Sequence, residues 1–296
     1  MKERTALKTY APSYYKDFHC IADKCGHTCC AGWDVDIDEE SLKRYKEMKG
    51  GFADRLTQCI DFGKDPHFIL TPDGRCPLLN ESGLCELIIH EGEDALCQIC
   101  RDHPRFRNFW TGRVEIGLGM ACEEAARLIL SQKEPLHLEL IGDTEPADEE
   151  LPEDEQYLMQ VRKQLLEDAA ADIESIFCLE ETETQAEFIK NTPEAPGNRA
   201  CAEPLKRLAE YLIYRHIADA LYDDRLEERT VFIQRVFSEL SERWTDGKTE
   251  TLAEIVRSWS NEFEYDTDRI GDMLDKISDE IRDETPEDGY DGIPAF

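Results

Sequence analysis

Apolar residues in the second half of the chain recur every three or four positions, the spacing of one face of an α-helix. In the first of these repeats, Leu158, Val161 and Leu165 would line one side of a helix. The same spacing predicts five helices, at about 157–179, 205–216, 231–240, 252–259 and 270–277. The stretch NTPEAPGN, residues 191–198, separates the first helix from the second. No run typical of a buried strand interrupts the series, so this half is predicted to be helical.

The first part of the chain has a different pattern, in which short segments are broken by turn signals such as the Gly50-Gly51 pair. Helices are predicted at about 38–49, 94–103 and 122–131, with a short strand at 68–70. Pro104 should end the second helix, because proline disfavours helical backbone in the residue before it. A small, loop-rich domain of this kind has a weak apolar core and often depends on a bound metal.

An acidic stretch joins the two parts. Residues 143–155, DTEPADEELPEDE, contain two prolines, many acids and few apolar side chains, which is typical of a linker or a solvated helix start. The fold class predicted is therefore mainly α. A loop-rich, cysteine-cluster metal-binding domain over residues 1–140 would pack with an acidic α-helical domain over residues 141–296.

The formal net charge of the 296 residues is −32, and it is unevenly distributed. Residues 1–140 hold 24 acidic and 18 basic side chains, whereas residues 141–296 hold 42 and 16. So acidic a chain repels the phosphate backbone, which argues against nucleic acid as a partner. A lysine-bearing protein would be attracted at long range. The plain alternative is that the charge only solvates the helices and keeps the protein soluble.

The chain begins MKERTALKTY, which is not a signal segment, and no later stretch approaches the ~20 apolar residues of a membrane span. We therefore expect a cytoplasmic protein with no membrane partner. In that reducing compartment, cysteines are expected to be metal ligands rather than disulfides. Ten of the twelve cysteines lie in the first 122 residues, so the chemistry they carry is concentrated there.

Four cysteines stand within eleven positions of CIADKCGHTCCAGW, residues 20–33. Others follow in CPLLNESGLC (76–85), in CQIC (97–100) and at Cys122. Thiolates are soft, anionic ligands that suit zinc and iron–sulfur clusters, and a metal shell gathers them from distant segments. Eight thiols would suffice for two four-ligand sites, or for one cluster and a second metal.

Several assignments within this cluster stay open. The adjacent Cys29 and Cys30 point in different directions, so we expect them to serve different shells, or one to ligate while the other packs. Four histidines could each complete a zinc shell, although each alone is more typical of an ordinary polar residue: His27, His67, His90 and His103. Three cysteines fit the role of small buried apolar residues: Cys59, Cys178 and Cys201.

A possible cofactor-binding motif lies in VEIGLGMACEEAARLIL, residues 114–130. An acid, a G-x-G and a following helix resemble the glycine-rich turn with which many methyltransferases hold S-adenosylmethionine. That fold needs strands and helices to alternate over another hundred or more residues. Only helical patterns follow here, and Cys122 within the stretch is already explained by the cysteine cluster. We reject the motif as a cofactor site.

The cysteine-bearing motifs together resemble a known family. CIADKCGHTCCAGWDVDID, then GRCPLLNESGLCELIIHEGEDALCQICRDHPRF, then MACEEAARLIL are similar to the YkgJ-type cysteine-cluster domain and, more closely, to the flagellin lysine-N-methylase family. The resemblance covers about residues 10–135. It makes eight thiols the metal ligands: Cys20, Cys25, Cys29, Cys30, Cys76, Cys85, Cys100 and Cys122. Cys97 is an extra, His103 replaces the usual aromatic before Pro104-Arg105, and Glu123 stands where the family has proline.

The resemblance implies an enzyme that transfers a methyl group from S-adenosylmethionine to lysine ε-amines of flagellin. It also implies an iron–sulfur cluster, [4Fe–4S], on these cysteines, with zinc as the alternative metal. The alternative function, from a different class, is a non-catalytic zinc- or iron-binding protein that acts as a metal carrier or a structural module.

Lysine methylation places one demand on the site. Only the neutral amine is nucleophilic, and the reference pKa of lysine is about 10.4, so the enzyme must desolvate or deprotonate it. Asp34, Asp36 and Asp38 are candidates for this task, although their alternation equally fits the polar face of a short strand. For the cofactor, Trp33 could stack on its adenine or sulfonium and Arg105 could pair with its carboxylate. The sequence fixes no catalytic residue.

Overall fold

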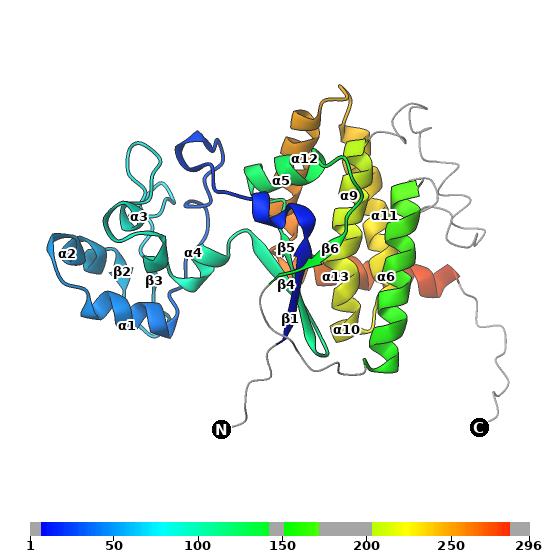
Figure 1. Cartoon of the computed structure of the whole chain (residues 1–296), viewed down its shortest axis with the longest axis horizontal. Helices are drawn as coiled ribbons and strands as arrows, with labels where there is room; N and C mark the ends of the chain where they lie inside the picture. Colours follow the sequence, from blue (N-terminus) through cyan, green and yellow to red (C-terminus); the bar gives the residue numbers. More distant parts are fainter. Residues whose placement is uncertain (1–6, 142–150, 172–202, 285–296) are drawn as a thin grey trace.

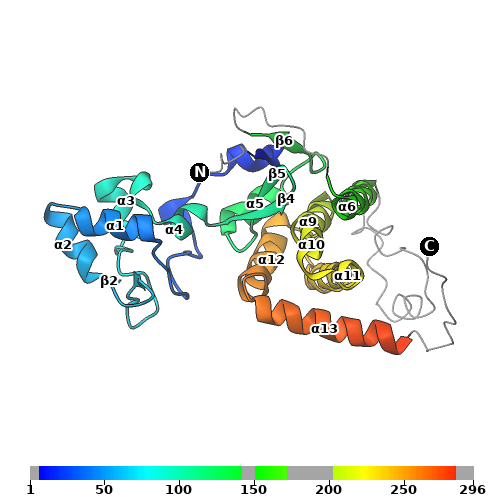
Figure 2. The same ribbon diagram turned by 90° about the horizontal axis from the view of Figure 1, so that it is seen from below.

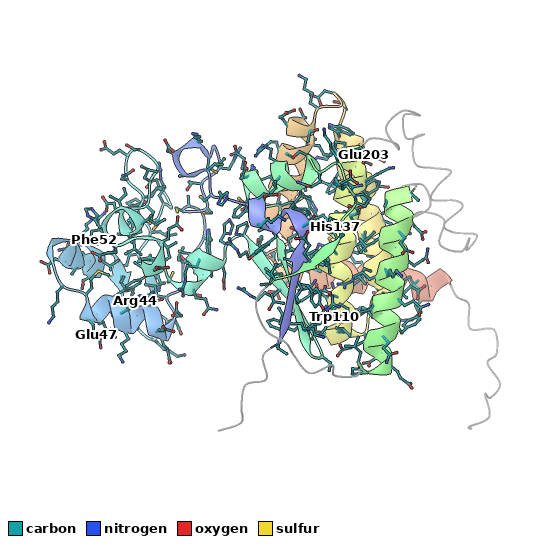
Figure 3. The ribbon with its side chains drawn as sticks, in the orientation of Figure 1. Arg44, Glu47, Phe52, Trp110, His137 and Glu203 are labelled. Atoms are coloured by element: carbon teal, nitrogen blue, oxygen red, sulfur yellow. The ribbon has the colours of Figure 1, made fainter. Side chains whose placement is uncertain are left out.

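The computed structural model of the chain describes residues 7–141, 151–171 and 203–284. Figure 1 shows two lobes side by side: a first lobe of short helices and loops, residues 19–104, and a second lobe in which a small sheet lies against longer helices. The turned view in Figure 2 keeps the two lobes separate. Figure 3 places Arg44 and Phe52 on the first lobe and Trp110, His137 and Glu203 on the second.

The first lobe is built from short elements around a small apolar cluster. Its elements are η2 (Ala22–Lys24), α1 (Glu39–Glu47), α2 (Gly51–Gln58), β2 (Ile60–Asp61), β3 (His67–Phe68), α3 (Glu86–Glu91), η3 (Glu93–Ala95) and α4 (Gln98–Asp102). Buried Tyr45, Leu56 and Phe68 belong to the cluster. Helix α1 begins where it does because the Asp38 carboxylate accepts the Ser41 N–H at 2.9 Å, which caps the first turn.

A four-stranded sheet forms one side of the second lobe, in the order β4-β5-β1-β6. The strands are β1 (Lys8–Pro12), β4 (Arg105–Trp110), β5 (Arg113–Leu118) and β6 (Leu138–Leu140), and η1 (Ser13–Asp17) follows β1. β4 and β5 form an antiparallel hairpin, whose turn uses Gly112 at φ 70°. β1 pairs parallel to β5 and antiparallel to β6. The first lobe therefore leaves the sheet after β1 and returns to it at β4.

Helices form the rest of the second lobe, and in Figure 2 they lie to one side of the sheet. They are α5 (Glu123–Leu130), α6 (Glu153–Ala171), α9 (Glu203–His216), η4 (Ile217–Asp219), α10 (Ala220–Asp223), α11 (Leu226–Arg243), α12 (Thr249–Phe263) and α13 (Thr267–Glu284). Nearly all of α9 is buried, so it is the central helix of this lobe. None of the helices in these described ranges combines the length and apolar composition that a membrane crossing needs.

The mainly α fold class is confirmed, and so are the helical repeats of the second half, which correspond to α6, α9, α11, α12 and α13. The helix expected at 94–103 is shorter and covers only Gln98–Asp102. Residues 172–179, the separating stretch 191–198, Cys178 and Cys201 lie outside the described residues. The division at residue 140 stays a prediction.

The four-stranded sheet was not predicted from the sequence. Its strand β4, RFRNFW, alternates charged with aromatic residues, and its exposed Phe109 makes the alternation irregular. β1 ends in proline and β6 is only three residues long, so neither has a strong strand pattern. The buried face of the sheet, which includes Trp110 and Leu118, packs into the same apolar cluster as the helices.

A buried ion pair joins the sheet to α6. The Glu115 carboxylate, which is fully buried in β5, accepts two hydrogen bonds from the Arg162 guanidinium at 2.6 and 2.8 Å. The same guanidinium lies over the Trp110 ring, 4.7 Å from its centroid. Arg113 pairs with the same carboxylate but is partly exposed. Arg162 and Glu115 are both removed from water, so Arg162 is the main buried partner of the Glu115 charge.

Arg162→Ala is expected to lower the free energy of unfolding by about 3–5 kcal/mol, because it leaves the Glu115 charge buried and without its main partner. Urea unfolding followed by circular dichroism measures the change. The control is Lys163→Ala on the next position of α6, where the pair with Glu167 is exposed and worth about 0–1 kcal/mol. Equal losses in the two variants would contradict the role given to the buried pair.

A second buried carboxylate lies on α9. Glu210 is 2% exposed, accepts the Leu136 N–H at 3.0 Å and pairs with Arg207 at 3.2 Å. Its other oxygen has no hydrogen-bond partner. Burial raises the pKa of Glu210 to about 7, although Arg207 acts in the opposite direction. The folded state therefore favours the protonated carboxyl.

This raised pKa predicts a pH dependence of stability. The ordinary value, 4.5, applies to the unfolded chain, so the contribution of Glu210 is fully present below pH 4.5 and is lost as pH rises towards 7. Glu210→Gln should remove up to about 3 kcal/mol of that decline. Urea titrations of both chains at pH 4.5, 6 and 8 test it. Glu239→Gln, at an exposed position of α11 paired with Arg243, is the control and should leave the slope unchanged.

Candidate metal centre

The four clustered cysteines lie on a loop between the lobes, residues 20–33, which we call the thiol loop. Its end is joined to the strand-like segment at residues 74–76. Gly32 N–H donates to the Gly74 carbonyl at 2.9 Å, and Cys76 N–H donates to the Cys30 carbonyl at 2.7 Å. Trp33 donates its indole N–H to the Cys29 carbonyl at 2.8 Å. These backbone contacts bring cysteines 46 positions apart in the sequence close together.

One group of thiols lies where the thiol loop meets the second lobe. We call it the seam thiols, and its members are Cys20, Cys25, Cys29 and Cys122. Burial raises the pKa of the Cys25 thiol to about 11, and the neighbouring Glu123 and Cys122 add to this rise. Burial raises the pKa of Cys122 as well, with a contribution from Cys20. The mutual effects indicate four thiols in one neighbourhood.

A second group lies within the first lobe. We call it the lobe thiols, and its members are Cys30, Cys76, Cys85, Cys97 and Cys100. Burial raises the pKa of Cys76 to about 12, with contributions from Cys30 and Cys85. Cys85 and Cys97 precede the first turns of α3 and α4. Cys97, which the sequence analysis set aside as an extra, is fully buried among these thiols.

Two pairs of thiols lie close enough to act on each other. The neighbouring Cys29 thiol lowers the pKa of Cys30. Cys100 lowers the pKa of Cys97 in the same way. The adjacent Cys29 and Cys30 thus touch each other while their other thiol neighbours differ. Cys29 is influenced by Cys20 and Cys122, whereas Cys30 acts on Cys76 and Cys85.

The donor atoms of these residues are of the kind that a thiophilic metal binds. The thiols are not, however, arranged as a complete ligand shell. Within residues 7–141, 151–171 and 203–284, no three His, Cys, Asp or Glu side chains converge closely enough to hold a metal ion. Four thiols in one group and five in the other still provide the soft ligands that zinc or an iron–sulfur cluster takes. Binding would therefore require the thiols to turn inward.

The remaining cysteine of the described residues, Cys59, is accounted for by other contacts. It is buried at 2% exposure, and Arg55 donates to its sulfur at 2.8 Å. Among the histidines, His27 contacts the Glu123 carboxylate beside the seam thiols at 3.0 Å. His90 instead stacks on Phe52, with ring centroids 4.5 Å apart. Burial lowers the pKa of His103.

The three aspartates proposed from the sequence have different surroundings. Both oxygens of Asp38 are engaged, one by Ser41 N–H and the other by Gln98 N–H at 2.8 Å, so Asp38 holds the ends of two helices. Asp34 and Asp36 line an open pocket of about 330 Å³. Three further ionisable residues of that pocket were not singled out from the sequence, where turn signals surround them: Asp61, Lys64 and Asp65. His67, one of the four histidines considered as zinc ligands, lines the same pocket.

The two cofactor candidates have internal partners. The Trp33 ring is partly buried against the apolar cluster of the first lobe. Arg105 donates to the Tyr15 hydroxyl at 2.8 Å and to the Arg101 carbonyl at 3.0 Å, and its guanidinium lies 5.5 Å from the Phe18 ring centroid. Arg105 thus joins the segment that leaves the second lobe to the segment that returns to it. A role for either residue in cofactor binding stays a prediction.

The G-x-G of β5 is explained by close packing. A Cβ on Gly117 would clash with the Phe106 ring. A Cβ on Gly119 would lie 2.6 Å from the Tyr265 hydroxyl and 3.1 Å from the Pro104 carbonyl oxygen. Side chains and backbone therefore occupy the space that a cofactor phosphate or carboxylate would need at such a turn.

A buried hydrogen-bond chain supports the turn that carries Cys122. Met120 N–H donates to the Tyr211 hydroxyl at 3.1 Å, and that hydroxyl donates to Glu264 at 2.7 Å. Burial alone would raise the pKa of Glu264, but the Arg215 charge and a hydrogen bond from His216 lower it to about 2. A charged carboxylate therefore anchors the chain. Nothing in the local sequence pattern indicates this connection over more than 140 positions.

Comparison with known proteins confirms the resemblance seen in the cysteine motifs. The chain is 28% identical over 145 residues to the "Flagellar biosynthetic protein FliU" of Salmonella muenchen, a match that covers 47% of this chain and 84% of that protein. It is equally similar to proteins named "Lysine-N-methylase" from Salmonella choleraesuis and Salmonella typhimurium. The chain is thus related to lysine-N-methylases.

The matches cover only part of each of the two proteins named lysine-N-methylase. The matched part spans 35% of the length of each of the two methylases. No family model matches the chain, and no solved structure matches it. The activity and substrates of the whole protein are therefore taken up as a proposal.

Tyr211→Phe is expected to lower the free energy of unfolding by about 1–3 kcal/mol, because one hydroxyl serves both Met120 N–H and Glu264 and both are buried. Urea unfolding measures the change. Tyr222→Phe is the control. The Tyr222 hydroxyl makes one hydrogen bond, to the Phe109 carbonyl, but the residue is 68% exposed. A smaller loss in Tyr211→Phe than in Tyr222→Phe would sink the interpretation.

Proposed function

We propose that this chain is a protein-lysine N-methyltransferase that uses S-adenosylmethionine and depends on a metal centre held by its cysteines. The relationship to proteins named lysine-N-methylase carries this proposal. The gathering of nine thiols from four separate segments into two neighbourhoods supports the metal dependence, because free packing cysteines need no such clustering.

The seam thiols and the lobe thiols would hold the metal. Of these nine, the eight expected from the family resemblance are Cys20, Cys25, Cys29, Cys30, Cys76, Cys85, Cys100 and Cys122, and Cys97 is the ninth. An iron–sulfur cluster of the [4Fe–4S] type is the group we favour, and when bound it would supply redox-active iron to the site. Zinc, the alternative, would supply a redox-inert Lewis acid or a structural cross-link.

The transfer itself needs a neutral lysine amine close to the sulfonium methyl. The amine nitrogen attacks the methyl carbon, the carbon–sulfur bond breaks, S-adenosylhomocysteine leaves and the new ammonium group loses a proton. Asp34 and Asp36 remain the candidates for accepting that proton, because they line an open pocket with Asp61 and Asp65 and are not engaged as Asp38 is. The negative charge there would also attract a lysine side chain.

The substrate we favour is flagellin or another lysine-bearing protein. Two observations support it: one relative is named a flagellar biosynthetic protein, and residues 141–296 hold 42 acidic against 16 basic side chains. Such a surface would raise the encounter rate with a basic protein and would do so less at high salt. We place the reaction in the reducing cytoplasm, where the thiols stay available as ligands.

A second candidate function is a non-catalytic zinc- or iron-binding protein. The observation that favours it is the partial match, which spans only 35% of each methylase. A chain that resembles an enzyme over part of that enzyme's length can bind metal and lack the activity.

The test combines metal analysis with a methylation assay. Full-length protein purified anaerobically is expected to be brown, with about four irons and four sulfides for a [4Fe–4S] cluster, and to add methyl groups from labelled S-adenosylmethionine to flagellin lysines, detected by mass spectrometry. Cys100→Ser should lose metal and activity together. Cys59→Ala, which changes a cysteine held by Arg55, should keep both.

Opposite results separate the alternatives. Colourless protein with stoichiometric zinc would sink the iron–sulfur assignment. Metal-loaded protein that adds no methyl group under reducing conditions would leave the carrier function in place of the enzyme.

A further inference from the structure

The carboxylate of Glu123 lies at the point where the thiol loop meets the second lobe. One of its oxygens, Oε2, accepts the Gly26 N–H at 2.8 Å and lies 3.0 Å from His27 Nδ1. The Cys25 thiol donates to the same oxygen at 3.7 Å. All three partners are about 97 positions away in the sequence, so Glu123 makes a long-range contact with the thiol loop.

The position of Glu123 in the second lobe is fixed by the turn that precedes it. Glu123 is the first residue of α5 and directly follows Cys122. The preceding turn is held by the Met120 N–H bond to Tyr211. A residue larger than glycine at position 119 would strike the Tyr265 hydroxyl and the Pro104 carbonyl oxygen. Cys122 therefore has a fixed position in the second lobe, and the thiol loop must be brought to it.

A second carboxylate reaches the thiol loop but acts more weakly. His27 Nε2 lies 3.4 Å from Glu254 Oε1 on α12, and Arg257 also pairs with Glu254. Within the part of the chain that the structure describes, Glu254 makes no hydrogen bond to Gly26 or Cys25, both of which contact Glu123 instead. The two ring nitrogens of His27 thus contact carboxylates from α5 and α12, but only Glu123 also accepts a hydrogen bond from the backbone of the thiol loop.

We propose that Glu123 is a positioning residue, which holds Cys25 beside Cys122 so that the seam thiols are assembled from both lobes. The inference rests on the proposed metal-dependent function, because it concerns the thiols that would bind the metal. It gives a role to the residue at which this chain departs from the proline typical of similar sequences. A proline at this position would carry no acceptor for Gly26 N–H or His27.

The size of the expected effect follows from the position of Glu123 outside the thiol set. Residues that orient metal ligands typically change metal affinity by about 10- to 100-fold when they are removed. A surface ion pair with no such role contributes little to stability. The Glu123 side chain is 33% exposed, so a large effect on metal affinity would come from ligand placement rather than from burial of its charge.

The first experiment titrates Co²⁺ into the reduced, metal-free full-length chain and follows the thiolate-to-cobalt absorption. Glu123→Ala is expected to weaken the tightest cobalt binding about 10- to 100-fold. Glu123→Gln keeps an oxygen acceptor for Gly26 N–H and should restore most of the affinity. Glu254→Ala removes the weaker carboxylate on His27 and should bind cobalt as the parent chain does.

A double-mutant cycle separates positioning from a general loss of structure. If Glu123 acts by placing Cys25 against Cys122, Glu123→Ala should have little further effect on cobalt affinity in a Cys122→Ala chain. Additive losses would overturn the proposal. Unchanged cobalt affinity in Glu123→Ala would also overturn it, and so would an equal loss in Glu123→Gln, which would make the carboxylate charge, not its acceptor geometry, the important property.

A measurement without metal keeps the test independent of cobalt binding and of activity. Hydrogen exchange at the Gly26 amide should be faster in Glu123→Ala than in the parent and should return towards the parent rate in Glu123→Gln. Equal exchange rates in all three chains would contradict the contact. Neither readout involves S-adenosylmethionine or lysine, so a chain that binds cobalt as expected but methylates nothing would sink the enzymatic proposal alone.

Discussion

The structure depends most on the contact between the thiol loop and the first turn of α5. On one side, Glu123 accepts hydrogen bonds from a loop 97 positions earlier in the chain. On the other, the buried chain from Met120 through Tyr211 to Glu264 fixes the same turn to the core of the second lobe. Cys122 packs against the apolar cluster of the second lobe, whereas Cys25 lies on the thiol loop, so this contact holds the two cysteines beside each other.

The helices could be predicted from the sequence because their apolar positions repeat over many turns, as in α11 and α12. The sheet could not, since β1 and β6 are short and are paired only through contacts with distant strands. The cysteines could be recognised as a set from their type and clustering. Their division into two groups could not, because it depends on which side of the thiol loop each sulfur faces.

Individual residues of the candidate site show the same limit. Asp38 stands in an acidic alternation with Asp34 and Asp36, yet only the structure reveals that it caps α1 and also accepts a hydrogen bond from Gln98. Glu123 was visible in the sequence as a departure from similar chains, but its partner Gly26 is not deducible from spacing. Residue type indicated the chemistry available, and tertiary contacts determined which groups were free for it.

Arg105 gives the first lobe a property that neither lobe has alone. Its hydrogen bond to the Tyr15 hydroxyl joins the two points at which the chain leaves and re-enters the sheet. The 86 residues between positions 18 and 105 therefore form an insertion with its ends tied together. Closing those ends in advance removes part of the conformational entropy that the insertion would otherwise lose on folding. The sheet at its base thus helps to order a lobe whose own apolar core is small.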